Sequence, residues 1–178
     1  LGSATYPARF QLVAAANPCP CGNHGVAGLH CTCAPLTARR YLERLSGPLL
    51  DRIDLRQVLR PVRRAYLREA GSAESSAVVG ERVAAARERQ AARLASLGLR
   101  TNAEVPGPLL RRALSLPRGS DLLDQAVSRG ELSARGVDRV LRVAWTIADL
   151  AGAMVPTRDH LHAALAMRRG EEREALCG

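Results

Sequence analysis

Residues 133–152, SARGVDRVLRVAWTIADLAG, predict a long amphipathic helix. Ser133 is suited to cap its first turn, because a serine hydroxyl accepts a hydrogen bond from a backbone N–H of that turn. Apolar side chains then recur at spacings of three and four residues, which gathers them on one face of the helix. These side chains are Val137, Val140, Leu141, Ala144 and Ala148. Such a face predicts packing against other helices.

Helical patterns continue on both sides of this stretch. Ser75 or Ser76 can cap a helix whose apolar positions fall near one face, namely Val79, Val83, Ala86, Leu94 and Leu97. Residues 106–116 and 120–129 predict two shorter helices, and Thr157 can cap a last one, RDHLHAALAMRR. Five helices without an intervening strand predict an all-α bundle. We expect it to occupy residues 69–178, beginning with a polar linker of small residues, EAGSAESS, at 69–76.

The first part of the chain, residues 1–68, reads as α/β. The apolar run RFQLVAAA at 9–16 ends at Asn17 and Pro18, and its length and proline stop favour a buried parallel strand. Thr37 can cap a helix through ARRYLERL that stops before Gly47. Ile53, Leu55 and Val58 then predict a second strand. Because the sequence opens directly on a strand pattern, we expect a protein cut in mid-domain.

Composition narrows the function. The chain has 178 residues, 47% of them hydrophobic, which is typical of a soluble globular protein. No apolar run is long enough to cross a membrane and no leader opens the chain, so we expect a cytoplasmic protein without a membrane partner. All 26 basic residues are arginine and the net charge is +9, which indicates an anionic partner or a genome rich in G and C. Without lysine the chain cannot contain a Walker A phosphate loop.

Four of the five cysteines lie between residues 19 and 33. Cys19 and Cys21 form one pair, Cys31 and Cys33 a second, and the glycines between them allow the loop to fold back. Four thiolates around one point suit a closed, structural zinc site, and the metal would offset the entropy lost in ordering a loop with few apolar residues. His24 or His30 could replace one sulfur. Two disulfides, or four unligated thiols, remain the alternatives.

Two blocks of sequence closely resemble the magnesium-chelatase-like AAA+ proteins of the ComM/YifB family. The first is FQLVAAANPCPCG…CTC…ARRYLERLSGPLLDRIDL, residues 10–55, and the second is LSARGVDRVLRVAWTIADLAG, residues 132–152. The resemblance implies the C-terminal portion of a longer ATPase whose preceding part carries a Lon-protease-like domain and the Walker A and B motifs. Residues 1–68 would then be the last strands of the α/β AAA+ core with the zinc loop, and residues 69–178 the helical lid.

The same resemblance implies an activity. ComM-type proteins resemble ring-forming DNA helicases that drive branch migration during natural transformation, whereas the chelatase branch drives Mg²⁺ insertion into porphyrin. The expected cofactors are therefore ATP and Mg²⁺ in the complete protein and structural Zn²⁺ in this chain. The expected partners are DNA and identical subunits, as a hexamer. This chain alone should not hydrolyse ATP.

Three polar residues match positions that act on nucleotide in this family. Asn17 resembles sensor 1, which orients the attacking water, although an asparagine before proline also suits a plain turn. Arg52 resembles the arginine finger, which reaches a neighbouring subunit's γ-phosphate; the alternative is a local ion-pair cluster with Asp51 and Asp54. Arg135 resembles sensor 2, and a cation at a helix N-terminus opposes the macrodipole unless an anion approaches it.

Several features remain open. Tyr6 and Arg9 resemble a pore-facing hairpin, and the arginine-rich runs at 60–68 and 82–93 are solvated helix faces or phosphate contacts. Family members often follow DRIDL with a more apolar strand, whereas Arg56 and Gln57 make this segment polar. The main alternative function is a zinc-stabilised nucleic-acid-binding module without ATPase activity. A third is a chelatase-type ATPase subunit.

Overall fold

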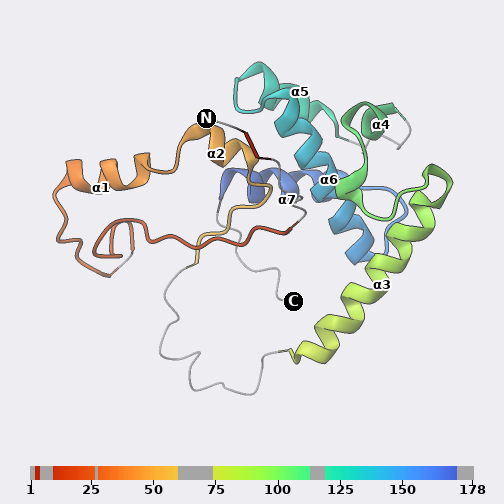
Figure 1. Cartoon of the computed structure of the whole chain (residues 1–178), viewed down its shortest axis with the longest axis horizontal. Coiled ribbons are helices and arrows are strands. Elements are labelled where there is room, and N and C mark those ends of the chain that lie inside the picture. The colour runs from red at the N-terminus through yellow and green to blue at the C-terminus, as the bar shows by residue number, and fades with distance from the viewer. Residues whose placement is uncertain (1–2, 5–9, 27, 60–73, 113–118, 172–178) are drawn as a thin grey trace. The chain divides into compact units, whose positions relative to one another are not determined.

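The computed structural model describes residues 3–4, 10–26, 28–59, 74–112 and 119–171 (Figure 1). The chain forms two compact units, Leu1–Gly47 and Pro48–Gly178. The domain boundary predicted between residues 68 and 69 lies in the segment 60–73, outside the described residues, and stays a prediction. Within the described residues, the segment after Gly47 belongs with the helices of the second unit.

The first unit contains the cysteine loop and one helix, α1 (Pro35–Glu43). Proline at the first helical position starts α1, since it lacks the N–H that would be unpaired there. Thr37 therefore lies inside the helix and does not cap it, contrary to the sequence prediction. Ala38 is the buried residue of α1, so the helix itself contributes little apolar packing.

The two predicted strands are wrong for the described residues. Residues 10–16 carry no strand and are exposed, with Phe10 76% and Val13 84% accessible. The segment with Ile53, Leu55 and Val58 also forms no strand. A strand needs a neighbour that accepts and donates backbone hydrogen bonds, and none is available in the described part of the chain. The α/β half of the predicted fold is therefore not observed.

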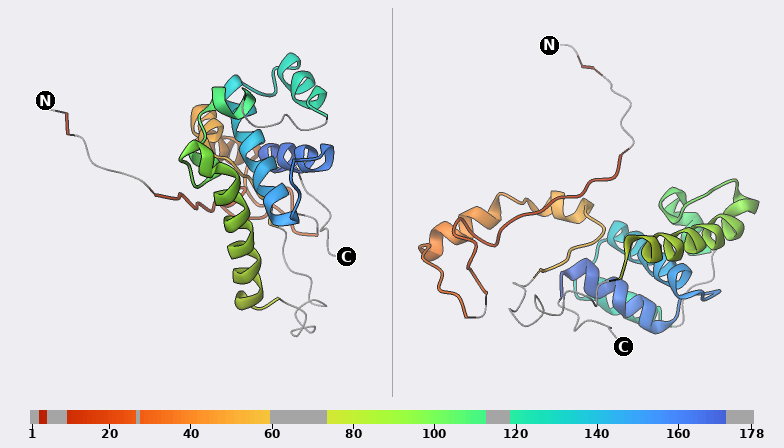
Figure 2. Two further views of the ribbon diagram at one scale, coloured as in Figure 1. Left: turned by 90° about the vertical axis from the view of Figure 1, so that its right-hand side faces the viewer. Right: turned by 90° about the horizontal axis from the view of Figure 1, so that it is seen from below.

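All the regular secondary structure among the described residues of the second unit is helical (Figure 2). In chain order its elements are α2 (Gly47–Arg52), α3 (Ser76–Leu94), the 3₁₀ turns η1 (Ala95–Leu97) and η2 (Asn102–Glu104), α4 (Gly107–Arg112), α5 (Asp121–Ser128), α6 (Ala134–Ala151) and α7 (Arg158–Arg169). The bundle predicted from the apolar periodicity is thus present, with α2 and the two 3₁₀ turns in addition. No helix in the described ranges has the length and apolar character that a membrane span requires.

Helix α6 is the centre of this unit and packs against α3, α4, α5, α7 and η2 (Figure 1). Its predicted apolar face is buried at Val140, Leu141, Ala144 and Ala148. On α3 only the C-terminal half packs: Ala86 and Leu94 are buried. Val79 and Val83, predicted on the same face, are 37% and 44% exposed.

The caps predicted at Ser133, Ser75 and Thr157 are confirmed, unlike the one predicted at Thr37. Ser133 Oγ accepts from Gly136 N at 3.1 Å, and Ser75 Oγ accepts from Val78 N at 3.3 Å. Thr157 Oγ1 accepts from His160 N at 3.4 Å. Each hydroxyl pairs a backbone N–H that a helix start would otherwise leave without a partner. These caps fix where α6, α3 and α7 begin.

A buried polar cluster joins α3, η2 and α6. Asp149 is 1% exposed, and its carboxylate accepts from both terminal nitrogens of Arg93. It also accepts from Gln90 at 3.2 Å and from Asn102 at 3.0 Å. The Arg93 guanidinium lies 4.2 Å from the centre of the Trp145 ring, within the range of a cation–π contact. The charge of Asp149 is therefore paired where water cannot reach it.

Candidate metal centre and nucleotide-site residues

The cysteine loop is folded by tight turns. Gly22 N donates to the Cys19 carbonyl at 3.0 Å, which closes a turn that contains Cys21. Gly22 has φ 82°, a left-handed conformation that costs glycine little and other residues more. Asn23 Nδ2 donates to the His30 carbonyl at 3.1 Å, which holds the two ends of the loop together. The second cysteine pair is thereby returned to the first.

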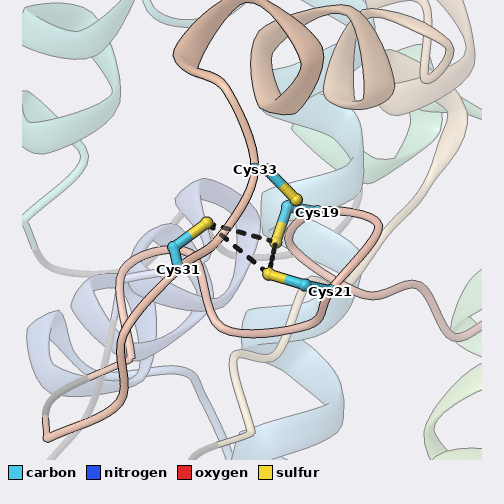
Figure 3. Close-up of side chains that lie close together, drawn as sticks. All are labelled: Cys19, Cys21, Cys31 and Cys33. Carbon is cyan, nitrogen blue, oxygen red and sulfur yellow. Dashed lines mark hydrogen bonds between the residues drawn. The ribbon is translucent and has the colours of Figure 1, made fainter.

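The four sulfur atoms converge on one point (Figure 3). The Cys19 sulfur lies 3.3 Å from that of Cys21 and 3.8 Å from that of Cys31, and the sulfurs of Cys21 and Cys31 are 3.6 Å apart. All four, including Cys33, lie within 4.8 Å of one another. A tetrahedral zinc site with Zn–S bonds of about 2.3 Å has sulfur–sulfur edges of ~3.8 Å. The cluster therefore fits a metal ion of this size.

Backbone groups and neighbouring thiols divide the four cysteines into two kinds. A backbone hydrogen bond at Asn23, with contacts to Cys19 and Thr32, lowers the pKa of Cys21 to about 5. The backbone of Cys21 also lowers the pKa of Cys33, but the Cys21 thiol and loss of solvent outweigh this effect and raise it to about 12. The loop thus favours the thiolate form of Cys21 and the protonated form of Cys33, whose proton a bound cation would displace.

The histidine alternatives are not part of this cluster. Within the residues that the structure describes, the group able to hold a metal consists of Cys19, Cys21, Cys31 and Cys33 alone. All four are free thiols. Four sulfurs leave no open coordination position for water or substrate, so the site suits a structural role and not a catalytic one.

The three nucleotide-site candidates occupy different places. Asn17 is exposed in the extended segment two residues before Cys19, not at the end of a strand as predicted. Arg52 is the last residue of α2 and is exposed, and its Nη1 donates to the Pro48 carbonyl at 2.8 Å. Arg135 is exposed in the first turn of α6, without a hydrogen bond or ion pair among the described residues. Arg52 and Arg135, which both belong to the second unit, share no hydrogen bond or ion pair among the described residues.

The aspartates that flank Arg52 pair with other arginines. Asp51 Oδ1 accepts from Arg168 Nη2 at 2.6 Å, and Asp54 pairs with Arg139. The local ion-pair cluster considered for Arg52 is therefore not formed. Its guanidinium stays exposed beside two carboxylates that other cations neutralise.

Sequence reasoning missed Arg168 and Arg139, which are far along the chain from the aspartates they bind. Arg139, with Arg142 and Asp54, also lines an open pocket of about 330 Å³. The one signal in the sequence was the polarity of Arg56, which indicated that the segment after DRIDL is not an ordinary buried strand. Tyr6, Arg9, the run at 60–68 and Cys177 lie wholly or mainly outside the described residues.

Two features define the class of protein: a helical domain built around one long capped helix, and a four-cysteine cluster preceding it. The family model for magnesium chelatase, subunit ChlI, matches residues 2–67, and the model for the C-terminal part of the same subunit matches residues 73–168. The chain belongs to this magnesium-chelatase-like family, which includes the YifB and ComM proteins.

Individual relatives match over most of this chain. An uncharacterised protein of Mycobacterium tuberculosis is 53% identical over 94% of this chain and 33% of its own length. YifB of Escherichia coli is 43% identical over 92% of this chain and 32% of its own length. The competence protein ComM of Haemophilus influenzae is 39% identical over 92% of this chain and 31% of its own length. The chain thus spans about a third of the length of the curated relatives it matches.

Proposed function

We propose that this chain is the C-terminal part of a ring-forming, cytoplasmic ATPase that moves on DNA as a hexameric helicase of the ComM type. The observation that carries the proposal is the state of Arg52. It is exposed on α2, while Asp51 and Asp54 are committed to Arg168 and Arg139. An arginine finger must extend from its own subunit to phosphate on the next one, which Arg52 can do by giving up its one exposed hydrogen bond, to the Pro48 carbonyl. Family membership supplies the ATPase context.

The other candidate residues support this role by their exposure. Arg135 extends from the first turn of α6, where its cation opposes the macrodipole and an incoming phosphate would be stabilised. Asn17 is an exposed amide able to orient a water molecule. ATP with Mg²⁺, when bound, supplies the phosphoryl group whose hydrolysis drives movement. Because the chain has no lysine, the Walker A lysine must come from a part of the protein outside this sequence.

Zinc is the metal we propose for the cysteine cluster. Four thiolates at these separations suit its tetrahedral geometry, and a Cys₄ site is structural. Among the described residues of the first unit, Cys19 and Ala38 are buried, whereas most of the large apolar side chains are exposed. A bound ion would therefore supply the order that apolar packing does not. This order would fix Asn17, which precedes the first ligand by two residues.

The test joins this chain to a nucleotide-binding partner. The N-terminal two-thirds of the Mycobacterium tuberculosis relative is produced in fusion with this chain, and ATP hydrolysis is measured with and without DNA. We expect hydrolysis that depends on both parts, with kcat lowered at least ~1000-fold by Arg52→Ala. The matched control is Arg129→Ala, since Arg129 is also an exposed arginine at the end of a helix. Equal activity of the two variants would reject the finger role.

A second candidate is favoured by the charge of +9, carried entirely by arginine. A stand-alone zinc-stabilised nucleic-acid-binding module would bind DNA tightly without a partner chain. Its affinity for DNA would fall steeply as the salt concentration rises, with a slope proportional to the number of phosphate contacts. The ATPase part would bind DNA weakly alone and tightly only within the assembled ring. A chelatase-type subunit, the third candidate, would hydrolyse ATP without any response to DNA.

A further inference from the structure

Arg56 caps the C-terminal end of α7. Its backbone N donates to the Met167 carbonyl at 2.8 Å, its Nε to the Arg168 carbonyl at 2.9 Å and its Nη2 to the Arg169 carbonyl at 3.2 Å. These carbonyls belong to the last turn of α7, where a helix leaves its C=O groups without partners. A guanidinium also suits the negative end of the helix macrodipole.

Arg168 in turn donates hydrogen bonds to backbone carbonyls at the C-terminal end of α2. Its Nη1 donates to the Leu50 carbonyl at 3.2 Å and to the Ile53 carbonyl, and its Nη2 donates to the Asp51 carbonyl at 3.0 Å. Its Nη2 also pairs with the Asp51 carboxylate at 2.6 Å. Arg168 is 8% exposed, so water competes little with these bonds. Arg56 thus binds the C-terminal end of α7, which carries Arg168, and Arg168 binds the C-terminal end of α2, which precedes Arg56. We call this pair of residues the arginine clasp.

Helix α2 depends on the clasp for its position. It has six residues and buries none of them, so apolar packing contributes little to holding it. A helix of this length is not stable alone in water. The bonds of the arginine clasp, together with the pairing of Asp54 with Arg139, therefore attach α2 and the residues after it to the helical unit.

We propose that Arg56 and Arg168 are positioning residues for Arg52. This inference rests on the proposed function, because it concerns the arginine finger. The clasp fixes the end of α2, at which Arg52 stands, against the last turn of α7. Arg52 then moves as a rigid part of the helical unit, Pro48–Gly178. A movement of these helices when nucleotide binds would carry the finger toward or away from the neighbouring subunit's phosphate.

The first test uses the chain alone and requires no activity. Arg168→Met keeps an unbranched apolar stem and removes every side-chain donor to α2. Arg169→Met is the matched control, because Arg169 is the adjacent residue of α7 and pairs with Glu131 and Glu171. Hydrogen exchange is followed at two reporter amides, Ile53 N, bonded to Leu50 O, and Arg56 N, bonded to Met167 O.

We expect exchange at both reporter amides to become at least ~10-fold faster in Arg168→Met and to stay unchanged in Arg169→Met. The amide of Val137, bonded to Ser133 O in α6, should keep its protection in both, which shows that the bundle remains folded. Arg56→Met serves as a second variant with the same expected pattern. Unchanged protection of the reporter amides in both clasp variants would overturn the proposal.

The second test uses the fusion with the nucleotide-binding part. Arg168→Met should lower kcat roughly 10- to 100-fold with little change in KM, since a misplaced group costs turnover rather than nucleotide binding. In the Arg52→Ala background the same substitution should have no further effect. An additive loss would overturn positioning through Arg52. If the fusion shows no hydrolysis at all, the proposed function fails, while the exchange experiment still decides whether the clasp holds α2.

Discussion

Replacement of Asp149 by alanine should destabilise the helical unit more than any change of a surface charge. The substitution removes the acceptor of Arg93, Gln90 and Asn102, and the last two are each 3% exposed. Removing one partner of a buried ion pair costs about 3–5 kcal/mol. The Arg93 side chain keeps 18% of its exposure, so water can solvate part of the cation. We therefore expect a loss near the lower limit, about 3 kcal/mol, or roughly a 10 °C fall in Tm.

The assay is urea unfolding of the chain, followed by the fluorescence of its single tryptophan, Trp145, beside Arg93. The matched control is Asp138→Ala on the same helix, whose partner Arg111 is 42% exposed, and which should cost no more than ~1 kcal/mol. The double variant Asp149→Leu, Arg93→Met should recover the part of the loss that comes from the unpaired charge, but not the part that comes from the buried amides of Gln90 and Asn102, which still lack their acceptor. Equal costs for Asp149→Ala and Asp138→Ala would refute this account of the buried cluster.

Three further predictions concern the metal site and the helices. Cys33, with a pKa of about 12, and Cys31, with a raised pKa, hold their protons at neutral pH, while Cys21, with a pKa of about 5, does not. Zinc binding should therefore release at least these two protons, so a chelator competition should show affinity rising at least ~100-fold per pH unit near neutrality. A pH-independent affinity would contradict this. Ser133→Ala should cost ~1 kcal/mol in the same unfolding assay, because it removes the cap of α6, and an unchanged midpoint would count against the cap. Leu161→Ala, at a fully buried position, should cost about 2–5 kcal/mol, whereas Leu150→Ala, at a 41% exposed position, should cost much less.

The helical unit was predictable because its signals are local. The caps at Ser75, Ser133 and Thr157 act within one turn, and the apolar spacing along 137–148 reports directly on the buried face of α6. The cysteine cluster was predictable for a similar reason. Two closely spaced pairs joined by a glycine-rich loop can meet without help from the rest of the chain, and they do so in the structure.

The strands and the clasp depend on partners distant in sequence. An apolar run such as 10–16 indicates what a segment would bury, but not whether a neighbouring strand is present to pair with it. Arg56 and the residues it caps are more than a hundred positions apart. Its polarity looked like a defect in a strand, whereas in the structure it completes the end of α7. The buried charge of Asp149 was likewise missed, since helical periodicity ranks an aspartate as exposed.

We propose that Cys19, Cys21, Cys31 and Cys33 together hold one structural zinc ion. Native mass spectrometry of the reduced chain, with elemental analysis of the same sample, measures the bound metal. We expect one zinc per chain, lost in Cys19→Ser and Cys31→Ser but kept in Cys177→Ser, the fifth cysteine of the sequence. A chain that is folded and free of metal, with all three variants equally stable, would contradict the account.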